Sequence, residues 1–270
     1  MTDLDEFYDA YERIEAEFQA VLDESLEPRG PDQLYDLVGE LGLPPDARVL
    51  DLGCGDGRHA LALAERFGMV VLGIDPVARH VEEARGAARR RPDVAARVSF
   101  ERGAAEAIPA PDASIDLVWC RDVLYHVAAL ELAYAECRRV LRDRGRIVIY
   151  QWFATDRLEP KEAAWLWQTM GVAPANGDAA RTERAIASAG LRVERRIDFG
   201  SEWGERLEEE RGDVSRRILR AARLLRAPER YVARFGRRAH DIMLADCLWH
   251  VYRMIGKLGP RAYVLSADLQ

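Results

Sequence analysis

The stretch that most constrains the fold covers residues 49–57 and reads VLDLGCGDG. Its apolar first half has the composition of a buried β-strand, and three glycines follow it at alternate positions. A helical pattern over residues 58–67 comes next, and a second apolar run over residues 69–74 ends in Asp75. This succession is typical of a nucleoside-binding unit, because glycines let the backbone approach a ligand and the acid can accept hydrogen bonds from ribose hydroxyls.

The spacing of the glycines separates one class of nucleotide from another. Dinucleotide-binding loops follow G-x-G-x-x-G, in which the last glycine allows close helix–strand packing beside a bound pyrophosphate. Arg58 occupies that last position here, whereas Gly53, Gly55 and Gly57 form G-x-G-x-G. The long side chain disfavours a pyrophosphate, and a triphosphate site lacks its G-x-x-x-x-G-K-[ST] run. The alternative interpretation is purely structural: the glycines form a tight turn, and the acid caps the next helix. This capping role is compatible with ligand binding.

Three motifs in a fixed order make the chain similar to a known family. VLDLGCGDG is followed by VVLGIDP and then by GAAEAIPAPDASIDLVWC, with strand-like runs between them. Together they resemble the class I S-adenosylmethionine-dependent methyltransferases over about residues 46–150. The resemblance implies an α/β fold: a Rossmann-like sheet of seven mostly parallel strands with helices on both faces. It also implies S-adenosylmethionine as the cofactor, bound across the carboxyl ends of the strands.

The resemblance assigns the methionine end of the cofactor to the first motif. It places Gly53, Cys54 and Gly55 along the methionine and ribose portion. Asp51 would orient this loop and reach the amino group of the cofactor, directly or through water. Cys120, at the end of the fourth expected strand, would offer its backbone to the methionine end.

The resemblance assigns the adenosine end of the cofactor to the second and third motifs. By resemblance, Asp75 takes the ribose hydroxyls and Pro76 flanks the adenine, while Ala105 and Glu106 lie beside the ring. Ala104 departs from the family pattern, which often has an acid at this position to accept from the adenine amino group. Adenine would then be held by backbone groups, by water or by Glu106.

Alternating strand and helix patterns predict a parallel sheet in one domain over residues 1–270. Strands are expected at 48–52, 70–75, 97–101, 115–120, 145–152, and near 191–199 and 260–268, the last being antiparallel in the resembled family. The domain is divided into an N-terminal helical lid (1–43), a cofactor-binding core (46–152) and two substrate-cap insertions (153–180 and 201–257).

Two helical segments are predicted outside the core, each with two possible roles. An amphipathic helix is predicted over residues 3–26, where it could lie over the cofactor through Tyr8 and Tyr11 or only cover the sheet. The insertion over 201–257 is predicted to form two helices divided at Ala227-Pro228. Aromatic residues gather in the cap segments, where they could line a substrate pocket or form the core of the insertion.

Composition limits the class of protein and its partners. The chain has 270 residues with 39 Lys and Arg against 46 Asp and Glu, so its formal net charge is −7. This balance disfavours a nucleic-acid surface, which requires a basic stripe. The four cysteines form no C-x-x-C pair, and no signal peptide or membrane-spanning run is visible. We therefore expect a cytoplasmic protein with no membrane association, while the oligomeric state stays open, a homodimer included.

The acceptor of the methyl group should bind near the loop after the fourth strand, RDVLYHV at residues 121–127. The loop lacks the Asn/Asp-Pro-Pro-Tyr and Pro-Cys motifs of enzymes that methylate macromolecules, so a small-molecule acceptor is expected. His126 is the candidate general base, because imidazole exchanges protons near neutral pH, and Tyr125 is a lesser candidate. The alternatives are packing or capping by His126.

The sequence also allows other functional hypotheses. Asp246 and His250 lie four residues apart and could form a structural pair more readily than a catalytic dyad, and no metal site is expected. The acceptor atom can be oxygen, nitrogen or carbon. The chain could also bind the cofactor without transferring its methyl group, as a cyclisation or rearrangement catalyst, whereas an NAD(P)-dependent reductase is disfavoured by Arg58.

Overall fold

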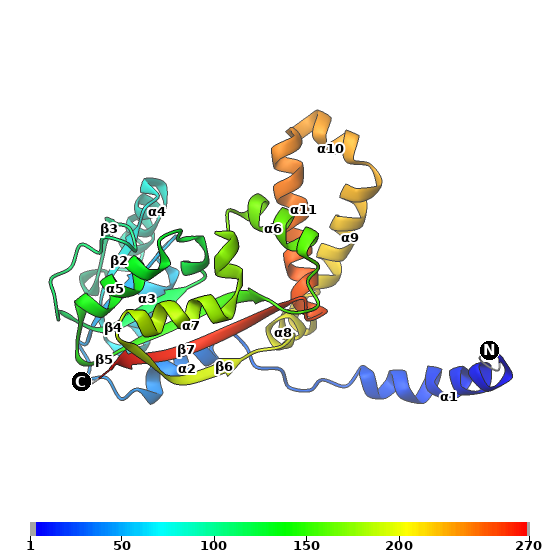
Figure 1. Cartoon of the computed structure of the whole chain (residues 1–270), viewed down its shortest axis with the longest axis horizontal. Helices are drawn as coiled ribbons and strands as arrows, with labels where there is room; N and C mark the ends of the chain where they lie inside the picture. The colour runs from blue at the N-terminus through cyan, green and yellow to red at the C-terminus, as the bar shows by residue number, and fades with distance from the viewer. Residues whose placement is uncertain (1–3, 269–270) are drawn as a thin grey trace.

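The computed structural model describes residues 4–268, which fold around one seven-stranded β-sheet (Figure 1). The strand order is β3-β2-β1-β4-β5-β7-β6, and only β7 runs antiparallel to its neighbours. The strands are β1 (Arg48–Leu52), β2 (Val70–Asp75), β3 (Val98–Arg102), β4 (Ile115–Arg121), β5 (Leu141–Ala154), β6 (Leu191–Asp198) and β7 (Leu258–Ala267). Seven mostly parallel strands with an antiparallel last strand confirm the expected fold class.

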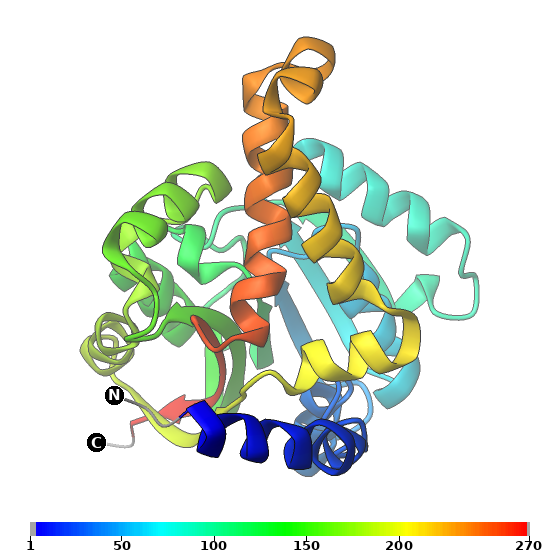
Figure 2. The same cartoon turned by 90° about the vertical axis from the view of Figure 1, so that its right-hand side faces the viewer.

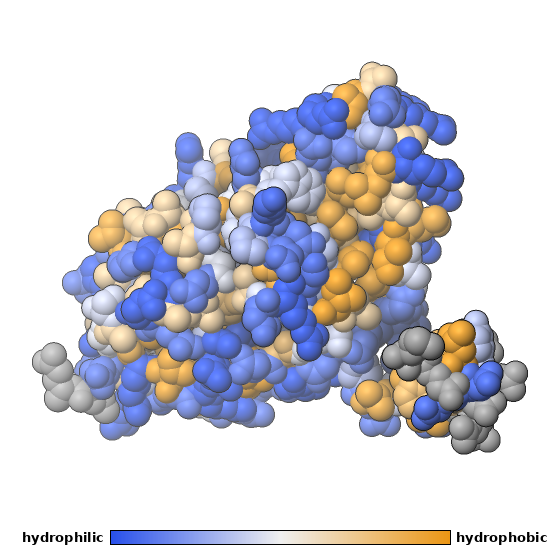
Figure 3. Space-filling model, turned by 45° about the vertical axis from the view of Figure 1, so that its right-hand side comes forward, coloured by the Kyte–Doolittle hydropathy of each residue, from blue (hydrophilic) through white to orange (hydrophobic). Residues whose placement is uncertain are grey.

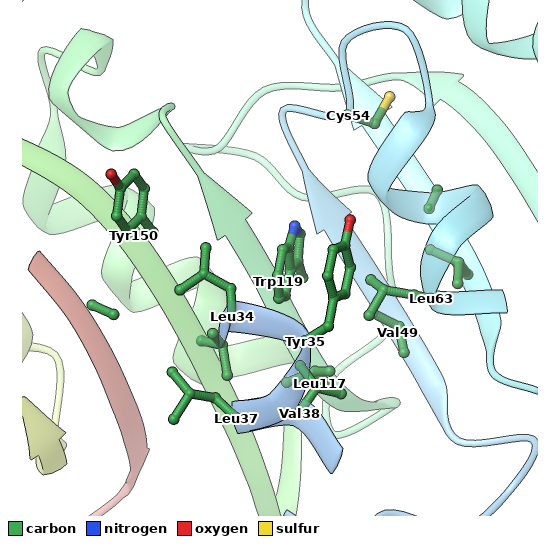
Figure 4. Packing of buried hydrophobic residues seen from close by; sticks show 14 of the residues in the cluster. Leu34, Tyr35, Leu37, Val38, Val49, Cys54, Leu63, Leu117, Trp119 and Tyr150 are labelled. Carbon is green, nitrogen blue, oxygen red and sulfur yellow. The ribbon is translucent and has the colours of Figure 1, made fainter. Parts of the chain in front are cut away.

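Helices cover both faces of the sheet because its strands are apolar on both faces. They are α2 (Gln33–Glu40), α3 (Arg58–Phe67), α4 (Ala78–Arg89), α5 (Leu130–Val140) and α7 (Ala179–Ser188). In β4, Leu117 and Trp119 point to the core shared with α2, α3 and α4, while Val118 and Cys120 point to the core shared with α5 and α7. Tyr35 of α2 stacks on Trp119 with ring centroids 5.2 Å apart (Figure 4).

The topology creates a crevice at the carboxyl ends of the central strands. The chain builds β1, β2 and β3 outward in one direction and then returns to place β4 on the other side of β1. At such a switch point the loops that follow the two neighbouring strands diverge to opposite faces, which leaves space between them. The loops after β1 and β4 therefore border the position where a ligand can enter.

The insertion before β7 forms four helices instead of the two that the sequence predicts. They are α8 (Glu202–Arg211), α9 (Asp213–Arg226), α10 (Pro228–Phe235) and α11 (Arg237–Met254). Besides the expected break at Ala227-Pro228, Gly212 and Gly236 interrupt the helical path with φ values of 62° and 83°. Helices α9 and α11 pack together and project from the sheet (Figures 1 and 2). Hydrophobic side chains gather on these projecting helices (Figure 3).

The N-terminal helix α1 (Leu4–Leu22) projects away from the sheet (Figure 1). It ends before the expected residue 26, and residue 3 of the predicted helix lies outside the described residues. Tyr8 and Tyr11 are 62% and 47% exposed. Within residues 4–268, no helix has the length and apolar character needed to cross a membrane.

Candidate active site

A cavity of about 650 Å³, here called the first cavity, lies at the carboxyl ends of β1, β2, β3 and β4. Each strand contributes the residues that directly follow it, as expected for an open α/β sheet. The lining residues are Leu52, Gly53, Gly55, Asp75, Pro76, Val77, His80, Gly103, Ala104, Ala105, Glu106, Arg121, Asp122, Val123, His126 and Val127. The structure thus brings the glycine loop, Asp75, Pro76, Ala105 and Glu106 of the sequence prediction to one cavity.

The glycine loop is shaped by close packing at one glycine and by open space at another. Gly53 has φ of +74°, and a Cβ there would lie 2.3 Å from a methyl carbon of Val123. Gly55 has φ of +52°, but a Cβ there would meet no atom within 4 Å. Gly53 is therefore required by protein packing, whereas Gly55 keeps the wall of the first cavity free of a side chain.

Asp75 forms the link between the glycine loop and the end of β2. One carboxylate oxygen accepts a hydrogen bond from the N–H of Gly55 (3.0 Å). The other accepts from the N–H of Val77 (2.9 Å) and lies 3.2 Å from Nδ1 of His80. An ionised carboxylate has about four acceptor positions, so capacity remains for a further donor from the cavity side. Asp75 thus both organises the residues before α4 and faces the first cavity.

Asp51 is a buried carboxylate behind the glycine loop. It is 2% exposed, and its Oδ2 has no hydrogen-bond partner among the described residues. Burial, with smaller contributions from the charges of Asp75 and Asp56, raises the pKa of Asp51 to about 7. A positively charged group near the loop would offset the free-energy cost of burying this carboxylate. Asp51 therefore fits a cofactor that carries an ammonium group.

The two cysteines of the predicted site turn their side chains away from the first cavity. Cys54 and Cys120 are 3% and 1% exposed, and both pack in the cores of the sheet. Burial raises the pKa of the Cys54 thiol to about 12 and that of Cys120 well above its ordinary value. Any contact they make to a cofactor would have to come from their backbone, as the sequence prediction proposed for Cys120.

A second cavity of about 350 Å³ adjoins the first, and Arg121, Asp122 and His126 line both. Its remaining walls come from the turn Leu124–His126, from β5, from the end of α6 (Pro160–Met170) and the residues after it, and from α8 and α11. These residues are Tyr125, Tyr150, Trp152, Met170, Val172, Trp203, Leu207, Asp246, Trp249, His250 and Arg253. Residues from the predicted cap segments therefore line a cavity as well as pack in the insertion.

Asp122 lies at the junction of the two cavities in a strained backbone conformation. Its φ of +60° is in the left-handed region, and its N–H donates to the carbonyl of Tyr150 (2.9 Å). Burial raises the pKa of its carboxyl group, and Oδ1 has no partner within the described part of the chain. Non-glycine residues with positive φ concentrate at functional sites. The sequence prediction did not assign a role to Asp122, because its backbone conformation has no local sequence signal.

His126 has a defined orientation at the same junction. Its Nδ1 lies 2.8 Å from the carbonyl oxygen of Gly171. Because a carbonyl can only accept, Nδ1 carries the proton and Nε2 keeps the lone pair in the neutral ring. The neighbouring Tyr125 is 8% exposed, and burial raises the pKa of its phenol well above its ordinary value.

Arg121 is held by a chain of hydrogen bonds that reaches α2. Its guanidinium lies 3.4 Å from Nε2 of His59, whose Nδ1 lies 2.7 Å from the hydroxyl of Tyr35. Burial and the nearby arginine charges lower the pKa of His59 to about 3, so this ring is neutral. The network was not predicted, because Tyr35, His59 and Arg121 lie far apart in the sequence.

The Asp246–His250 pair is weak, because the two side chains lie 3.9 Å apart and Asp246 pairs instead with Arg217. Burial lowers the pKa of His250 to about 4, which makes it neutral near pH 7. Among the described residues, no three His, Cys, Asp or Glu side chains gather in an arrangement that could hold a metal ion.

Comparison with known proteins agrees with this geometry. Residues 50–149 match the family described as a methyltransferase domain. The 27-O-demethylrifamycin SV methyltransferase of Amycolatopsis mediterranei is 38% identical over 113 residues, which cover 42% of this chain and 41% of that protein. The S-adenosyl-L-methionine-dependent Diels-Alderase iccD of Talaromyces variabilis is 39% identical over 120 residues, or 43% of this chain and 39% of that protein. The chain spans about two fifths of the length of these two relatives.

The similarity of fold extends beyond the matched core. The structure of a geranyl diphosphate methyltransferase in complex with S-adenosylmethionine superposes with a TM-score of 0.65 at 20% identity, covering 87% of this chain and 84% of that one. The orphaned carboxylate of Asp51, the open wall at Gly55 and the spare acceptor capacity of Asp75 fit the cofactor of this family. Residues 50–149 therefore form a methyltransferase domain of the class I S-adenosylmethionine-dependent type.

Proposed function

We propose that this protein transfers the methyl group of S-adenosylmethionine to a small molecule held in the second cavity. The observation that carries the proposal is the shared wall: Arg121, Asp122 and His126 line both cavities. A cofactor in the first cavity and an acceptor in the second would meet at these three side chains. In-line displacement requires this arrangement, since the nucleophile must approach the methyl carbon from the side opposite the sulfur.

The residues of the first cavity would hold the cofactor by complementary contacts. Asp75 would accept from the ribose hydroxyls with the acceptor capacity that its hydrogen bonds from Gly55 and Val77 leave free. Pro76, Ala105 and Glu106 would border the adenine. Asp51 would act on the amino group through the glycine loop or a water molecule, since its carboxylate lies behind the cavity wall.

The bound cofactor supplies an electrophilic methyl group, and the protein supplies position, exclusion of water and, where needed, a proton acceptor. We propose that His126 accepts the proton of an O–H or N–H nucleophile at Nε2, because its Nδ1 proton is engaged by Gly171. Tyr125 remains a protonated phenol near neutral pH, which favours a role in shaping the second cavity. Analysis of the methylated product would identify the acceptor atom as oxygen, nitrogen or carbon.

A second candidate function rests on a specific relative. The similarity to an S-adenosyl-L-methionine-dependent Diels-Alderase favours, as an alternative, a catalyst of cyclisation that binds the cofactor and leaves its methyl group in place. Both functions require the first cavity to bind the cofactor. They differ in whether the bound S-adenosylmethionine is converted to S-adenosylhomocysteine.

Cofactor binding is tested by calorimetry with S-adenosylmethionine, S-adenosylhomocysteine and NADPH on the wild-type protein and Asp75→Ala. We expect both adenosyl compounds to bind and NADPH to fail, with the substitution weakening affinity by more than about tenfold, or about 1.4 kcal/mol. Equal affinity in Asp75→Ala would refute the ribose assignment. Incubation with methyl-labelled cofactor and a panel of small acceptors then separates methyl transfer, which labels a product, from cyclisation, which does not.

A further inference from the structure

Hydrogen-bond donors without partners gather on the wall of the second cavity. Nε of Arg253, Nε1 of Trp203 and the hydroxyl of Tyr150 have no hydrogen-bond partner among the described residues. Arg253, Trp203 and Tyr150 are 6%, 2% and 1% exposed, so bulk water does not satisfy them. An unpaired buried donor costs about 1–3 kcal/mol, and a ligand with oxygen acceptors would remove several such penalties together.

The charge of the second cavity also has a definite sign. Arg121 and Arg253 line the second cavity as cations. Asp122 is an acidic residue of the same lining, and its arginine partner is Arg121, which also lines the cavity. The other carboxylate, Asp246, is neutralised by its ion pair with Arg217. The cavity therefore has a positive excess of about one charge.

Arginines of the protein itself lie over three of the five aromatic rings that line the second cavity, which disfavours these walls as a cage for a cationic ligand. The guanidinium of Arg121 lies 5.4 Å from the ring centre of Trp203 and 5.7 Å from that of Tyr150. The guanidinium of Arg253 lies 4.9 Å from the ring centre of Trp152. A cationic acceptor would be repelled by both guanidinium groups, whereas the same arrangement attracts an anion.

From these observations we propose that the second cavity binds an aromatic carboxylic acid, whose carboxylate is held by Arg253, Trp203 and Tyr150. The volume of about 350 Å³ suits a small ring system, and the aromatic side chains provide its apolar contacts. Arg253, Trp203 and Tyr150 line only the second cavity, whereas Asp122 and His126 also face the first.

This division orients the acid. The carboxylate lies at the wall away from the cofactor, and a different group of the same molecule lies at the junction, where His126 and Asp122 can contact it. The assignment rests on the proposed function, because the second cavity is the acceptor site only when the first holds the cofactor.

The test compares matched probes on the full chain saturated with S-adenosylhomocysteine. Benzoate and cinnamate are titrated against benzamide and cinnamamide, and binding is followed by calorimetry and tryptophan fluorescence. We expect each carboxylate to bind at least about tenfold more tightly than its neutral amide. Equal affinity within a pair, or failure of both carboxylates to bind, would overturn the proposal.

Variants locate the carboxylate within the cavity. Arg253→Met should abolish the preference for the carboxylates, Arg253→Lys should restore part of it, and Arg238→Met, at an exposed arginine of the same helix, should leave it unchanged. Trp203→Phe removes the indole N–H and keeps an aromatic ring, so it should lower the preference even if Arg253→Met does not fold. A full preference in Arg253→Lys, Arg253→Met and Trp203→Phe alike would place the carboxylate elsewhere and contradict the proposal.

The affinity for S-adenosylhomocysteine separates this inference from the proposed function. If S-adenosylhomocysteine binds and the probes show no preference, the acid assignment is wrong while the cofactor assignment stands. If S-adenosylhomocysteine does not bind, the proposed function fails, and the probe titrations then report on the second cavity alone.

Discussion

We predict that the buried charge of Asp51 destabilises the folded protein when no cofactor is bound. Its pKa of about 7, against an ordinary value of 3.8, is a shift of about three units, or about 4 kcal/mol at 1.36 kcal/mol per unit. Because the folded-state pKa is raised, the folded protein binds the proton more tightly than the unfolded chain. The free energy of unfolding therefore falls as pH rises from about 4 to about 7, and the full cost applies above that range.

Asp51→Asn removes the charge and keeps the shape of the side chain. We expect the variant to be more stable than the wild type without cofactor, by about 2 kcal/mol near pH 5 and by about 4 kcal/mol near pH 8. Urea unfolding followed by circular dichroism at both pH values measures these differences. Asp143→Asn, at an exposed aspartate, is the isosteric control and should show no such pH-dependent gain.

The same substitution should weaken the cofactor. Loss of a charged partner for the amino group should lower the affinity for S-adenosylhomocysteine by about tenfold or more, since hydrogen bonds to charged groups contribute about 1.5–3 kcal/mol. Stability and affinity would then move in opposite directions. A stability difference from the wild type that is the same at both pH values, or a gain in stability without a loss of affinity, would refute this explanation of Asp51.

Four other outcomes follow from the contacts of the site. His126→Ala should reduce turnover of an O–H or N–H acceptor by about 10²-fold or more while S-adenosylhomocysteine affinity is unchanged, and single-turnover kinetics with unaltered rates would exclude the base role. Gly53→Ala should lower the free energy of unfolding by about 2–4 kcal/mol, partly recovered by Val123→Ala, because a Cβ would meet Val123; denaturant unfolding of the single and double variants measures both effects. Gly55→Ala should cost only about 1–2 kcal/mol, and a cost equal to that of Gly53→Ala would contradict the packing argument. Buried Cys54, with its pKa raised to about 12, should resist a thiol reagent in the native protein, whereas rapid labelling in a variant that lacks the other cysteines would contradict its burial.

The parts of the fold that sequence reasoning could predict are those written in local patterns. The glycine loop, the strand that ends in Asp75 and the alternation of strands with helices follow from periodicity and turn residues, and the structure has them at nearly the predicted positions. The break at Ala227-Pro228 was also predicted, because proline begins a helix more readily than it continues one. The additional breaks at Gly212 and Gly236 were missed, because a glycine ends a helix only where tertiary packing uses its positive φ.

The candidate site was predicted less completely, because its second half depends on contacts between distant segments. Asp122, with its positive φ, and Arg253, which contributes to the second cavity from α11, carry no motif that distinguishes them in the sequence. The partnerless donors of the second cavity become visible only when β5, α8 and α11 are placed together. The aromatic residues of the cap were noticed, but the arginines that cover their ring faces were not.

The central claim is that an adenosyl cofactor in the first cavity presents its sulfur to an acceptor in the second. A crystal structure with S-adenosylhomocysteine tests it most directly. We expect the ribose hydroxyls within hydrogen-bond distance of Asp75 and the sulfur directed at the wall formed by Arg121, Asp122 and His126. A cofactor bound elsewhere, or one whose sulfur points away from that wall, would contradict the account.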